Sequence, residues 1–410
     1  MIPLEEARAR VLAGCGVSEP VWMSAAEAGG LVLAEAVIAT ELSPPWDNSA
    51  VDGYAVRAAD LVEVPVELEV IGEVAAGGWS ELECGPGQAI RIMTGAPIPS
   101  GADAVAMVED SELLGERGSG VERVRLHRIV EPGQAVRCAG EDTRPGERLF
   151  EPGTVITPAV TGVLAGSNTR QVKVWPRLRV AVLSTGDELV DDGGELQPGQ
   201  IRESNRPMLV RVLEQAGCEV KDLGIIPDDE EMLERVLRDA AERFDAIVTS
   251  GGVSMGDYDV VKAVLGRIAK MQWMQIAIKP AKPFAFGHIG GVPIFGLPGN
   301  PVSSLVSCEM LARPALRQMM GHRDVLTRDL GRPRMQALAA EPLVRRSDGK
   351  THLMRVNAIF GADGRCCVTP VRAQGSHQLA ATALANAIAI VPDGDGCDAG
   401  DAVEVVLLLG

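Results

Sequence analysis

The sequence predicts a multidomain α/β plus β protein, in which a doubly wound α/β domain accompanies a β-rich domain, an elongated connector domain and a C-terminal β-barrel. Three observations predict this organisation. The chain has 410 residues, which is too long for one ordinary hydrophobic core. Apolar runs of strand length alternate with helical patterns between residues 178 and 320. Short alternating strands, separated by glycine and proline, fill the segments on either side.

Four domains follow from these patterns. Residues 1–45 and 145–177 are expected to form N-terminal helices and the connector, because the segment 3–12 spaces its apolar side chains at helical intervals. A capping box at Ser24-Ala-Ala-Glu predicts a second helix, and Pro44-Pro45 ends the pattern. The remaining domains are a β-rich domain over 46–144, the α/β domain over 178–325 and the β-barrel over 326–410.

The β-rich domain contains polar turns that suit either a site or a solvated surface. The segment 46–56 places Asp47, Ser49 and Asp52 close together before a strand, and the turn 93–97 offers the hydroxyl of Thr94. A third stretch gathers charges that are as typical of a surface ion-pair cluster as of a site: Arg137, Glu141, Asp142 and Arg144.

In the α/β domain, polar loops follow the strands. Helices are expected over 207–216, 229–243, 257–264 and 302–320, with buried strands between them. Ligands of open α/β sheets bind beyond the carboxyl ends of the strands. The loops at 184–188, 227–229, 250–259 and 299–301 should therefore form one common site.

Among these loops, the stretch Asp245 to Val261 gives the most specific indication of a ligand-binding site. Its apolar run stops at Ser250-Gly-Gly, where backbone N–H groups can approach an anion. Asp257 and Asp259 follow at the start of a helix, and carboxylate oxygens suit magnesium. The alternative is a tight turn in which Asp257 merely caps the helix.

Composition excludes several functional classes. The net charge of −17 argues against general nucleic-acid binding, and no apolar run reaches membrane-spanning length. The N-terminus lacks the features of a signal peptide, so we expect a cytoplasmic protein. The eight cysteines show no C-x-x-C spacing, which favours buried, reduced thiols. An anionic ligand needs local cations, which Lys279 and Lys282 supply on a proline-stiffened loop.

Six motifs together resemble the MoeA family of molybdopterin molybdenumtransferases, which includes the gephyrin and plant Cnx E-domains. They occur in the family's order over nearly the whole chain: Asp47-Asn-Ser-Ala-Val-Asp-Gly-Tyr-Ala, Met93-Thr-Gly-Ala-Pro, Ser184-Thr-Gly-Asp-Glu-Leu, Ser250-Gly-Gly-Val-Ser-Met-Gly-Asp-Tyr-Asp, Lys279-Pro-Ala-Lys-Pro-Phe-Ala-Phe-Gly and Leu297-Pro-Gly-Asn-Pro-Val-Ser.

The resemblance implies the last step of molybdenum-cofactor synthesis. Adenylylated molybdopterin and molybdate would give the cofactor and AMP, with Mg²⁺ as the metal. It also implies a homodimer in which the β-rich domain of one chain completes the site of its partner. Further partners expected on this basis are the molybdopterin adenylyltransferase and apo-molybdoenzymes. Molybdate and tungstate remain equally open as the anion.

The family's functional positions map onto this sequence residue by residue. The resemblance implies catalytic roles for Asp52, Thr94, Glu188, Asp228 and Asp259, and metal binding by Asp228, Asp257 and Asp259. Substrate binding is implied for Ser184, Thr185, Gly186, Ser204, Asn205, Gly251, Gly252, Ser254, Gly299, Asn300 and Pro301. Molybdate contacts are implied for Lys279, Lys282, Pro283, Lys350, Arg355 and Ser376. From the residues alone, Ser376 could equally cap a helix.

The sequence departs from the family pattern at three places. Ala281 replaces a common glycine, which is a mild change only if its φ is negative. Ala380-Ala381 stand where many relatives have serines, and Lys350 stands where an arginine is common. Two other functions compete: the adenylyltransferase, whose fold resembles residues 178–320 alone, and a non-catalytic scaffold. The long β-rich segments and the Lys279 loop argue against the adenylyltransferase, and the complete set of acidic residues argues against the scaffold.

Overall fold

A computed structural model describes residues 1–114, 122–252, 260–323 and 330–408. The chain forms two compact units. The first comprises residues 1–21, 30–34 and 173–410, and the second comprises 22–29 and 35–172. Within the described residues, no helix combines the length and the apolarity needed to cross a membrane.

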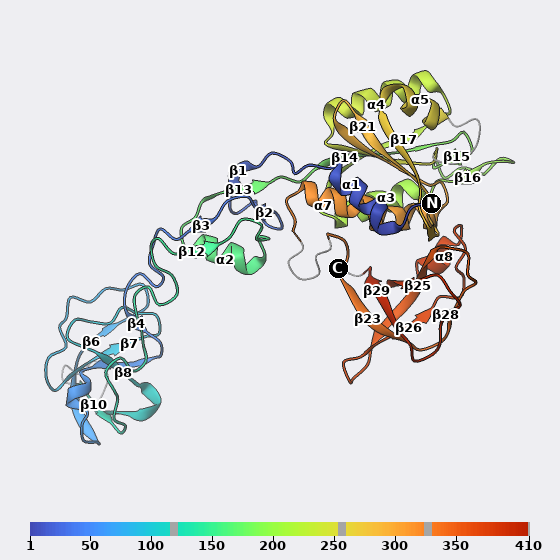
Figure 1. Cartoon of the computed structure of the whole chain (residues 1–410). Coiled ribbons are helices and arrows are strands. Elements are labelled where there is room, and N and C mark those ends of the chain that lie inside the picture. The colour runs from blue at the N-terminus through green and yellow to red at the C-terminus, as the bar shows by residue number, and fades with distance from the viewer. Residues whose placement is uncertain (115–121, 253–259, 324–329, 409–410) are drawn as a thin grey trace. The chain divides into compact units, whose positions relative to one another are not determined.

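The first unit is built on a six-stranded sheet (Figure 1). Its strand order is β17 (Glu219–Ile226), β14 (Arg179–Thr185), β18 (Ala246–Ser250), β22 (Val292–Leu297), β21 (Pro283–Ile289) and β19 (Lys270–Gln275). Neighbouring strands from β17 to β22 are parallel to one another. Strand β21 is antiparallel to β22, and β19 is antiparallel to β21. Parallel strands end at one edge of the sheet, which is where the polar loops of the sequence fall.

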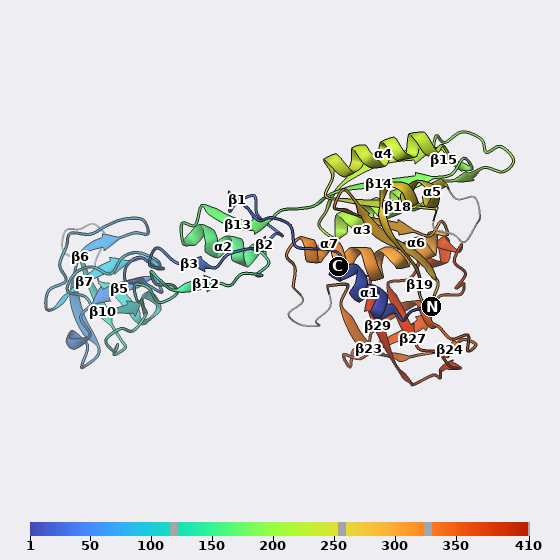
Figure 2. The same ribbon diagram turned by 45° about the horizontal axis from the view of Figure 1, so that its top comes forward.

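Helices cover both faces of this sheet, which confirms the doubly wound prediction (Figure 2). Alternate residues of β14 divide between the two cores, because Val180 and Val182 pack into one cluster and Ala181 and Leu183 into the other. One face carries α1 (Leu4–Ala13), α3 (Asn205–Gln215), α6 (Pro301–Ser307), a π-helical segment (Cys308–Ala312) and α7 (Arg313–Met319). The other face carries α4 (Glu230–Arg243) and α5 (Val260–Ile268).

The C-terminal strands close into the expected barrel. Its order is β25 (Thr351–Phe360), β26 (Cys366–Pro370), β23 (Arg334–Ala339), β29 (Ala402–Leu407) and β27 (Ala387–Val391), which pairs back onto β25. Strand β20 (Ile278–Lys279) joins β25 from outside the ring. Short elements complete this unit: β15 (Leu189–Val190), β16 (Ile201–Arg202), β24 (Leu343–Val344), β28 (Gly396–Cys397) and α8 (Leu379–Thr382).

The second unit is rich in β-structure, as the sequence predicts. Its main sheet has the order β8 (Ala104–Met107), β5 (Gly53–Val56), β7 (Gln88–Ile92), β6 (Val66–Val74), β10 (Glu122–Leu126) and β9 (Ser111–Leu114). Smaller pairings join β4 (Asn48–Ser49) to β11 (Val136–Arg137) and β3 (Val37–Ile38) to β12 (Arg148–Phe150), next to α2 (Pro158–Gly166) in the sequence. Two single turns are 3₁₀-helical, Ala58–Asp60 and Val108–Asp110.

The predicted second N-terminal helix is wrong. Val21–Ser24 is a strand, β1, which pairs with β13 (Gln171–Trp175), and β13 in turn pairs with β2 (Val32–Leu33). The supposed capping box forms only one turn, in which the Glu27 N–H donates to the carbonyl of Ser24. Gly30 then takes a positive φ of 81°, which a helix cannot continue. Pairing with residues distant in sequence overrides the local helical signal.

The cysteines follow the expectation in part. All eight thiols are free, and five are buried: Cys15, Cys84, Cys218, Cys308 and Cys366. Cys138 is exposed, contrary to the expectation of burial. Burial in apolar surroundings raises the pKa of the Cys15 thiol to about 12, so this side chain packs as a small hydrophobe.

Candidate active site

Three parallel strands end side by side in the first unit. Register pairs Ser184 of β14 with Ser250 of β18, and Ser250 with Leu297 of β22. The side chains of Ser184, Thr185 and Ser250 are buried at these ends. We call the loops that follow them, together with the loop after β17, the sheet mouth; it comprises residues 184–188, 227–229, 250–252 and 299–301.

The amide of Asn205 holds two loops of the sheet mouth together. Its Nδ2 donates to Ser250 Oγ at 2.8 Å and to the carbonyl of Gly299 at 2.6 Å. Asn205 is the first residue of α3, directly after Ser204. Among the described residues, Asn205 Oδ1 and Ser184 Oγ are buried and have no hydrogen-bond partner. Buried polar atoms without partners are costly, and a bound polar ligand would satisfy them.

The glycine pair is required by the turn after β18. Gly251 and Gly252 have φ values of 97° and 71°, in the region that favours glycine. A Cβ atom on Gly251 would lie 3.2 Å from the carbonyl oxygen of Thr185, and one on Gly252 would lie 2.2 Å from Val261. The Gly251 N–H donates to the Leu297 carbonyl at 3.1 Å. Backbone therefore lines this part of the mouth.

Carboxylates lie on two adjacent loops of the sheet mouth. Asp187, after β14, accepts the backbone N–H of Asp228, after β17, at 3.1 Å. A Cβ atom on Gly186 would lie 2.5 Å from the carboxylate of Glu188, so that carboxylate lies over the turn. Asp257, Asp259 and Ser254 lie outside the described residues. Among the described residues, no three His, Cys, Asp or Glu side chains gather in a way that could hold a metal.

The lysine loop runs from β20, which pairs with the barrel, to β21 of the main sheet. Lys279 and Lys282 are exposed, and Pro283 begins β21. Between the lysines, Ala281 is buried and has a φ of 75°. The replacement of glycine at this position is therefore not mild, because the left-handed region is unfavourable for alanine.

Two further residues of the predicted site, Arg355 and Ser376, belong to the C-terminal part of the first unit. The backbone carbonyl of Ser376 accepts the N–H of Val302 at 3.1 Å, so its turn meets the start of α6 beside Asn300 and Pro301. Arg355 is 2% exposed, and its Nε has no partner among the described residues. Burial lowers the pKa of Arg355 to about 10. The hydrogen bond from Arg355 Nη2 to the Gly375 carbonyl oxygen is long, at 3.5 Å.

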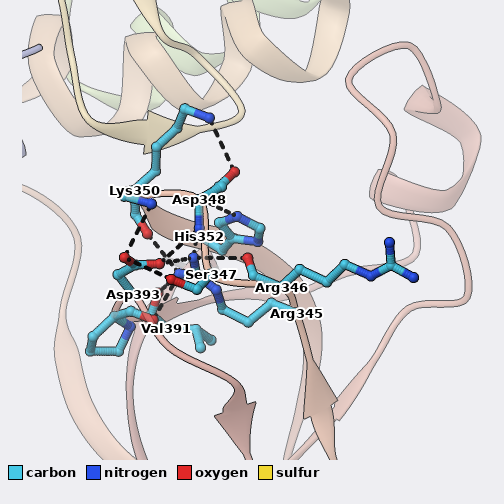
Figure 3. A network of polar contacts seen from close by, with 10 residues as sticks. Arg345, Arg346, Ser347, Asp348, Lys350, His352, Val391 and Asp393 are labelled. Carbon is cyan, nitrogen blue, oxygen red and sulfur yellow. Dashed lines mark hydrogen bonds and ion pairs between the residues drawn. The ribbon is translucent and has the colours of Figure 1, made fainter.

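Lys350 belongs to a dense polar network (Figure 3). Its Nζ lies 3.1 Å from Asp348 Oδ2, while His352 Nε2 lies 3.2 Å from Asp348 Oδ1. The buried Arg345 donates to the same Asp348 and to Asp393. We call residues 345–352 the basic turn.

Asp52 and Thr94 meet in the second unit. Asp52 Oδ1 accepts the backbone N–H of Thr94 at 2.7 Å and its hydroxyl at 2.8 Å. The pKa of Asp52 is lowered by the backbone hydrogen bond, then by the hydroxyl, and less by Arg91. Asp47 accepts the N–H of Ala139 at 2.7 Å, and Ser49 Oγ donates to the Val51 carbonyl. Asp47 and Ser49 thus hold the loop, while Asp52 and Thr94 form an exposed pair.

Comparisons with known proteins agree with this architecture. Residues 2–167 match the "MoeA N-terminal region (domain I and II)", residues 181–318 the "probable molybdopterin binding domain" and residues 339–408 the "MoeA C-terminal region (domain IV)". The molybdopterin molybdenumtransferase of Haemophilus influenzae is 37% identical over 99% of this chain and 98% of the relative. The chain belongs to the MoeA family.

Other relatives of the MoeA chain extend the match. The molybdopterin molybdenumtransferase of Bacillus subtilis is 33% identical over 99% of this chain and 94% of the relative. A solved structure of the molybdopterin biosynthesis MoeA protein of Pyrococcus horikoshii aligns with a TM-score of 0.80 and 28% identity, covering 99% of this chain and 100% of that one. The fold of this MoeA chain is therefore the family's fold.

Sequence reasoning missed three residues of the basic turn in this MoeA chain: Arg345, Asp348 and His352. Each looked like an ordinary charge of a β-rich segment. Strand register identifies His352, because β20 and β25 pair it with Lys279, and side-chain contacts connect Asp348 to His352 and Arg345 to Asp348. That pairing joins segments more than seventy residues apart, so no local pattern could reveal it.

Proposed function

We propose that this protein inserts molybdenum into molybdopterin: adenylylated molybdopterin and molybdate give molybdenum cofactor and AMP, with Mg²⁺ assisting. The observation that carries the proposal is the full-length match to relatives named molybdopterin molybdenumtransferase, 33–37% identical over 99% of the chain. The geometry of the first unit supports it, because a glycine-lined sheet mouth and a lysine loop occur in one compact unit.

The sheet mouth would hold the phosphate-bearing part of the substrate. The backbone at Gly251 and Gly252 can approach a phosphate closely because no side chain intervenes. The Ser184 hydroxyl can donate to a phosphate oxygen, whereas Asn205 Oδ1 can only accept from an N–H or O–H group of the substrate. No residue need act as a covalent nucleophile, because orientation and neutralisation of charge on the phosphates suffice for cleavage of the anhydride.

The carboxylates of the mouth fit a magnesium ion. Magnesium takes hard oxygen ligands and commonly binds through one or two carboxylates plus substrate phosphates. Asp228 and the sequence-predicted Asp257 and Asp259 would hold it, the last two lying outside the described residues. Bound magnesium would neutralise charge on the leaving phosphate. Asp187, which accepts the Asp228 N–H, ties the loop of Asp228 to the loop after β14.

The cations of the first unit would receive molybdate. Lys279 and Lys282 are exposed on a loop that Pro280 and Pro283 stiffen. Lys350, Arg355 and Ser376 are the further proposed contacts, and the poorly satisfied guanidinium of Arg355 is suited to an oxyanion. Magnesium dependence, these molybdate contacts and a cytoplasmic location stay predictions.

We also propose that the protein works as a homodimer. The exposed Asp52–Thr94 pair of one chain would act on substrate held by its partner. Mixing inactive Asp52→Ala protein with inactive Asp228→Ala protein should then restore partial activity, since some mixed sites receive an intact contribution from each chain. No recovery after demonstrated subunit exchange would contradict the shared site.

The reaction itself is tested with purified protein, adenylylated molybdopterin, molybdate and magnesium, by following AMP release and cofactor formation. Lys279→Ala/Lys282→Ala should raise the molybdate concentration for half-maximal rate by one or more orders of magnitude. Each ammonium contributes roughly 1–4 kcal/mol toward a partly shielded dianion. Binding of the adenylylated substrate should change much less.

Lys221→Ala is the matched control, because Lys221 is an exposed lysine of β17 outside the sheet mouth. Its molybdate dependence should equal that of the wild type. Collapse of substrate binding in the double variant with an unchanged molybdate dependence would assign the lysines to the substrate phosphate instead. Absence of AMP release under all conditions would contradict the proposed reaction.

A further inference from the structure

Three basic side chains converge at the junction of β20 and β25. Parallel register pairs Lys279 with His352, so their side chains project from the same face of the strand pair. Lys350 and His352 contact the two oxygens of one carboxylate, that of Asp348, at 3.1 and 3.2 Å. Lys279 and His352 therefore lie on one face of the strand pair beside the lysine loop, and Lys350 contacts the same carboxylate as His352.

Hydrogen bonds within the basic turn hold Lys350 and His352 in place. The side chain of Arg345 is fully buried and donates to the backbone carbonyls of Lys350, Val391 and Pro392. The carboxylate of Asp393 accepts the N–H groups of Asp348 and Gly349, each at 3.1 Å. Figure 3 shows Lys350 and His352 on either side of Asp348. A turn tied at this many points presents its side chains with little freedom.

Asp348 determines which nitrogen of His352 can meet a ligand. The pKa of Asp348 is lowered to about 2, chiefly by its hydrogen bond to Lys350, so the ionised carboxylate only accepts hydrogen bonds. His352 Nε2 must therefore carry the proton of that contact. Nδ1 of His352 has no hydrogen bond among the described residues. It accepts hydrogen bonds in the neutral ring and donates one in the protonated ring.

Burial and nearby cations lower the pKa of His352 below its ordinary value. Burial lowers the pKa of His352 first, and the nearby Arg345 and Lys279 lower it further, while Asp348 opposes them. The other charged side chains are Lys350 and the exposed Arg346 within the turn, and Asp393 outside it. A doubly negative oxyanion placed beside Lys279 would reverse this balance, because it favours the protonated ring.

We propose that His352 is a further oxyanion-binding residue of the site that contains Lys279 and Lys350, and that Asp348 is its positioning residue. The inference rests on the proposed function, which brings molybdate to this loop. His352 takes one proton from solvent at Nδ1 and donates that N–H to an oxygen of the tetrahedral dianion. Anion binding and proton uptake are then coupled, and each strengthens the other.

Isothermal titration of the full-length protein with molybdate tests this coupling. Heats measured at pH 7 in two buffers of different ionisation enthalpy give the number of protons taken up per anion. We expect a value between zero and one for the wild type, and an affinity that rises up to about tenfold per unit fall in pH within the coupled range. His352→Gln should remove both the uptake and the pH dependence, while retaining weaker binding through the lysines.

Two further variants separate the positioning of His352 by Asp348 from general structural damage. His127→Gln is the matched control, because His127 also faces a carboxylate, that of Glu112 at 3.9 Å, but belongs to the second unit. Its proton uptake should equal that of the wild type. Asp348→Asn removes the charge that favours the protonated ring, so the pH range of the coupling should move to lower pH. A purely structural loss would weaken binding without moving that range.

The outcomes distinguish this inference from the proposed function. Molybdate binding without proton uptake, or uptake that persists in His352→Gln, would overturn the role of His352 and leave the proposed reaction intact. Absence of molybdate binding between pH 6 and pH 8 would overturn both. Absence of proton uptake in the wild type would overturn the role of His352 even if a variant fails to fold.

Discussion

The sheet mouth and the basic turn prepare their side chains in opposite ways. The described part of the mouth has only acidic charges, those of Asp187, Glu188, Asp228 and Asp229; glycines, one asparagine amide and the ends of parallel strands form the rest of it. The basic turn is dense in charge, and a fully buried arginine connects two carboxylates with four backbone carbonyls. The sheet mouth exposes backbone to a ligand, whereas the basic turn holds basic side chains in place.

This difference follows from what each region would bind. A phosphoanhydride with magnesium brings its own neutralising charge, so the protein needs mainly space and backbone donors. A bare oxyanion approaching a chain of net charge −17 needs basic side chains that are held in place locally. Asp348 satisfies Lys350 and His352 in the absence of ligand and holds them at the site.

The largest expected effect is at Arg345. Arg345→Ala should lower the free energy of unfolding by about 3–5 kcal/mol, since it leaves the carbonyls of Lys350, Val391 and Pro392 without their donor and opens a buried cavity. Urea denaturation measures this change. Molybdate binding should weaken as well, because Lys350 and His352 lose their support.

Arg346→Ala is the matched control for that substitution. Arg346 is exposed, and Figure 3 shows its side chain pointing away from the network. Its replacement should change stability by less than about 0.5 kcal/mol. Equal losses at positions 345 and 346 would mean that charge, and not the buried network, stabilises the turn.

The same comparison explains what the sequence could predict. The sheet mouth is encoded locally, because strand, glycine pair and acidic residues follow one another in Ser184–Glu188 and after Ser250. Periodicity therefore located both the α/β domain and its polar edge. The basic turn depends on the β20–β25 pairing, which no local pattern contains. Register between distant segments is decided by tertiary packing.

A smaller effect is expected at Gly252. Gly252→Ala should destabilise the protein by about 2–3 kcal/mol, because φ is 71° and the new Cβ would lie 2.2 Å from the buried Val261. Thermal denaturation measures the loss, and binding of the adenylylated substrate should fall with it. Charge-based binding of molybdate to the lysine loop should change less.

Gly266→Ala provides the control in the neighbouring helix α5. No atom lies within 4 Å of a Cβ built there, and alanine favours helix, so this variant should be about 0.5–1 kcal/mol more stable than the wild type. Unchanged stability of Gly252→Ala would show that the turn after β18 can relax, and that backbone approach does not define the mouth.

The smallest effect is expected at Ala281, in the lysine loop between β20 and β21. Its positive φ costs alanine about 1–2 kcal/mol. Glycine would remove that cost, but it would lose about 0.5–1 kcal/mol to backbone entropy and about 0.8 kcal/mol of buried methyl. These terms nearly cancel, so Ala281→Gly should lie within about 1 kcal/mol of the wild type.

Ala277→Gly is the matched comparison, because Ala277 precedes β20 without a positive φ and should lose about 1 kcal/mol or more. The difference between the two variants in urea denaturation measures the strain at position 281. Equal losses of stability in the two variants would mean that alanine at position 281 is not strained. The glycine common in the family would then have a reason other than this backbone conformation.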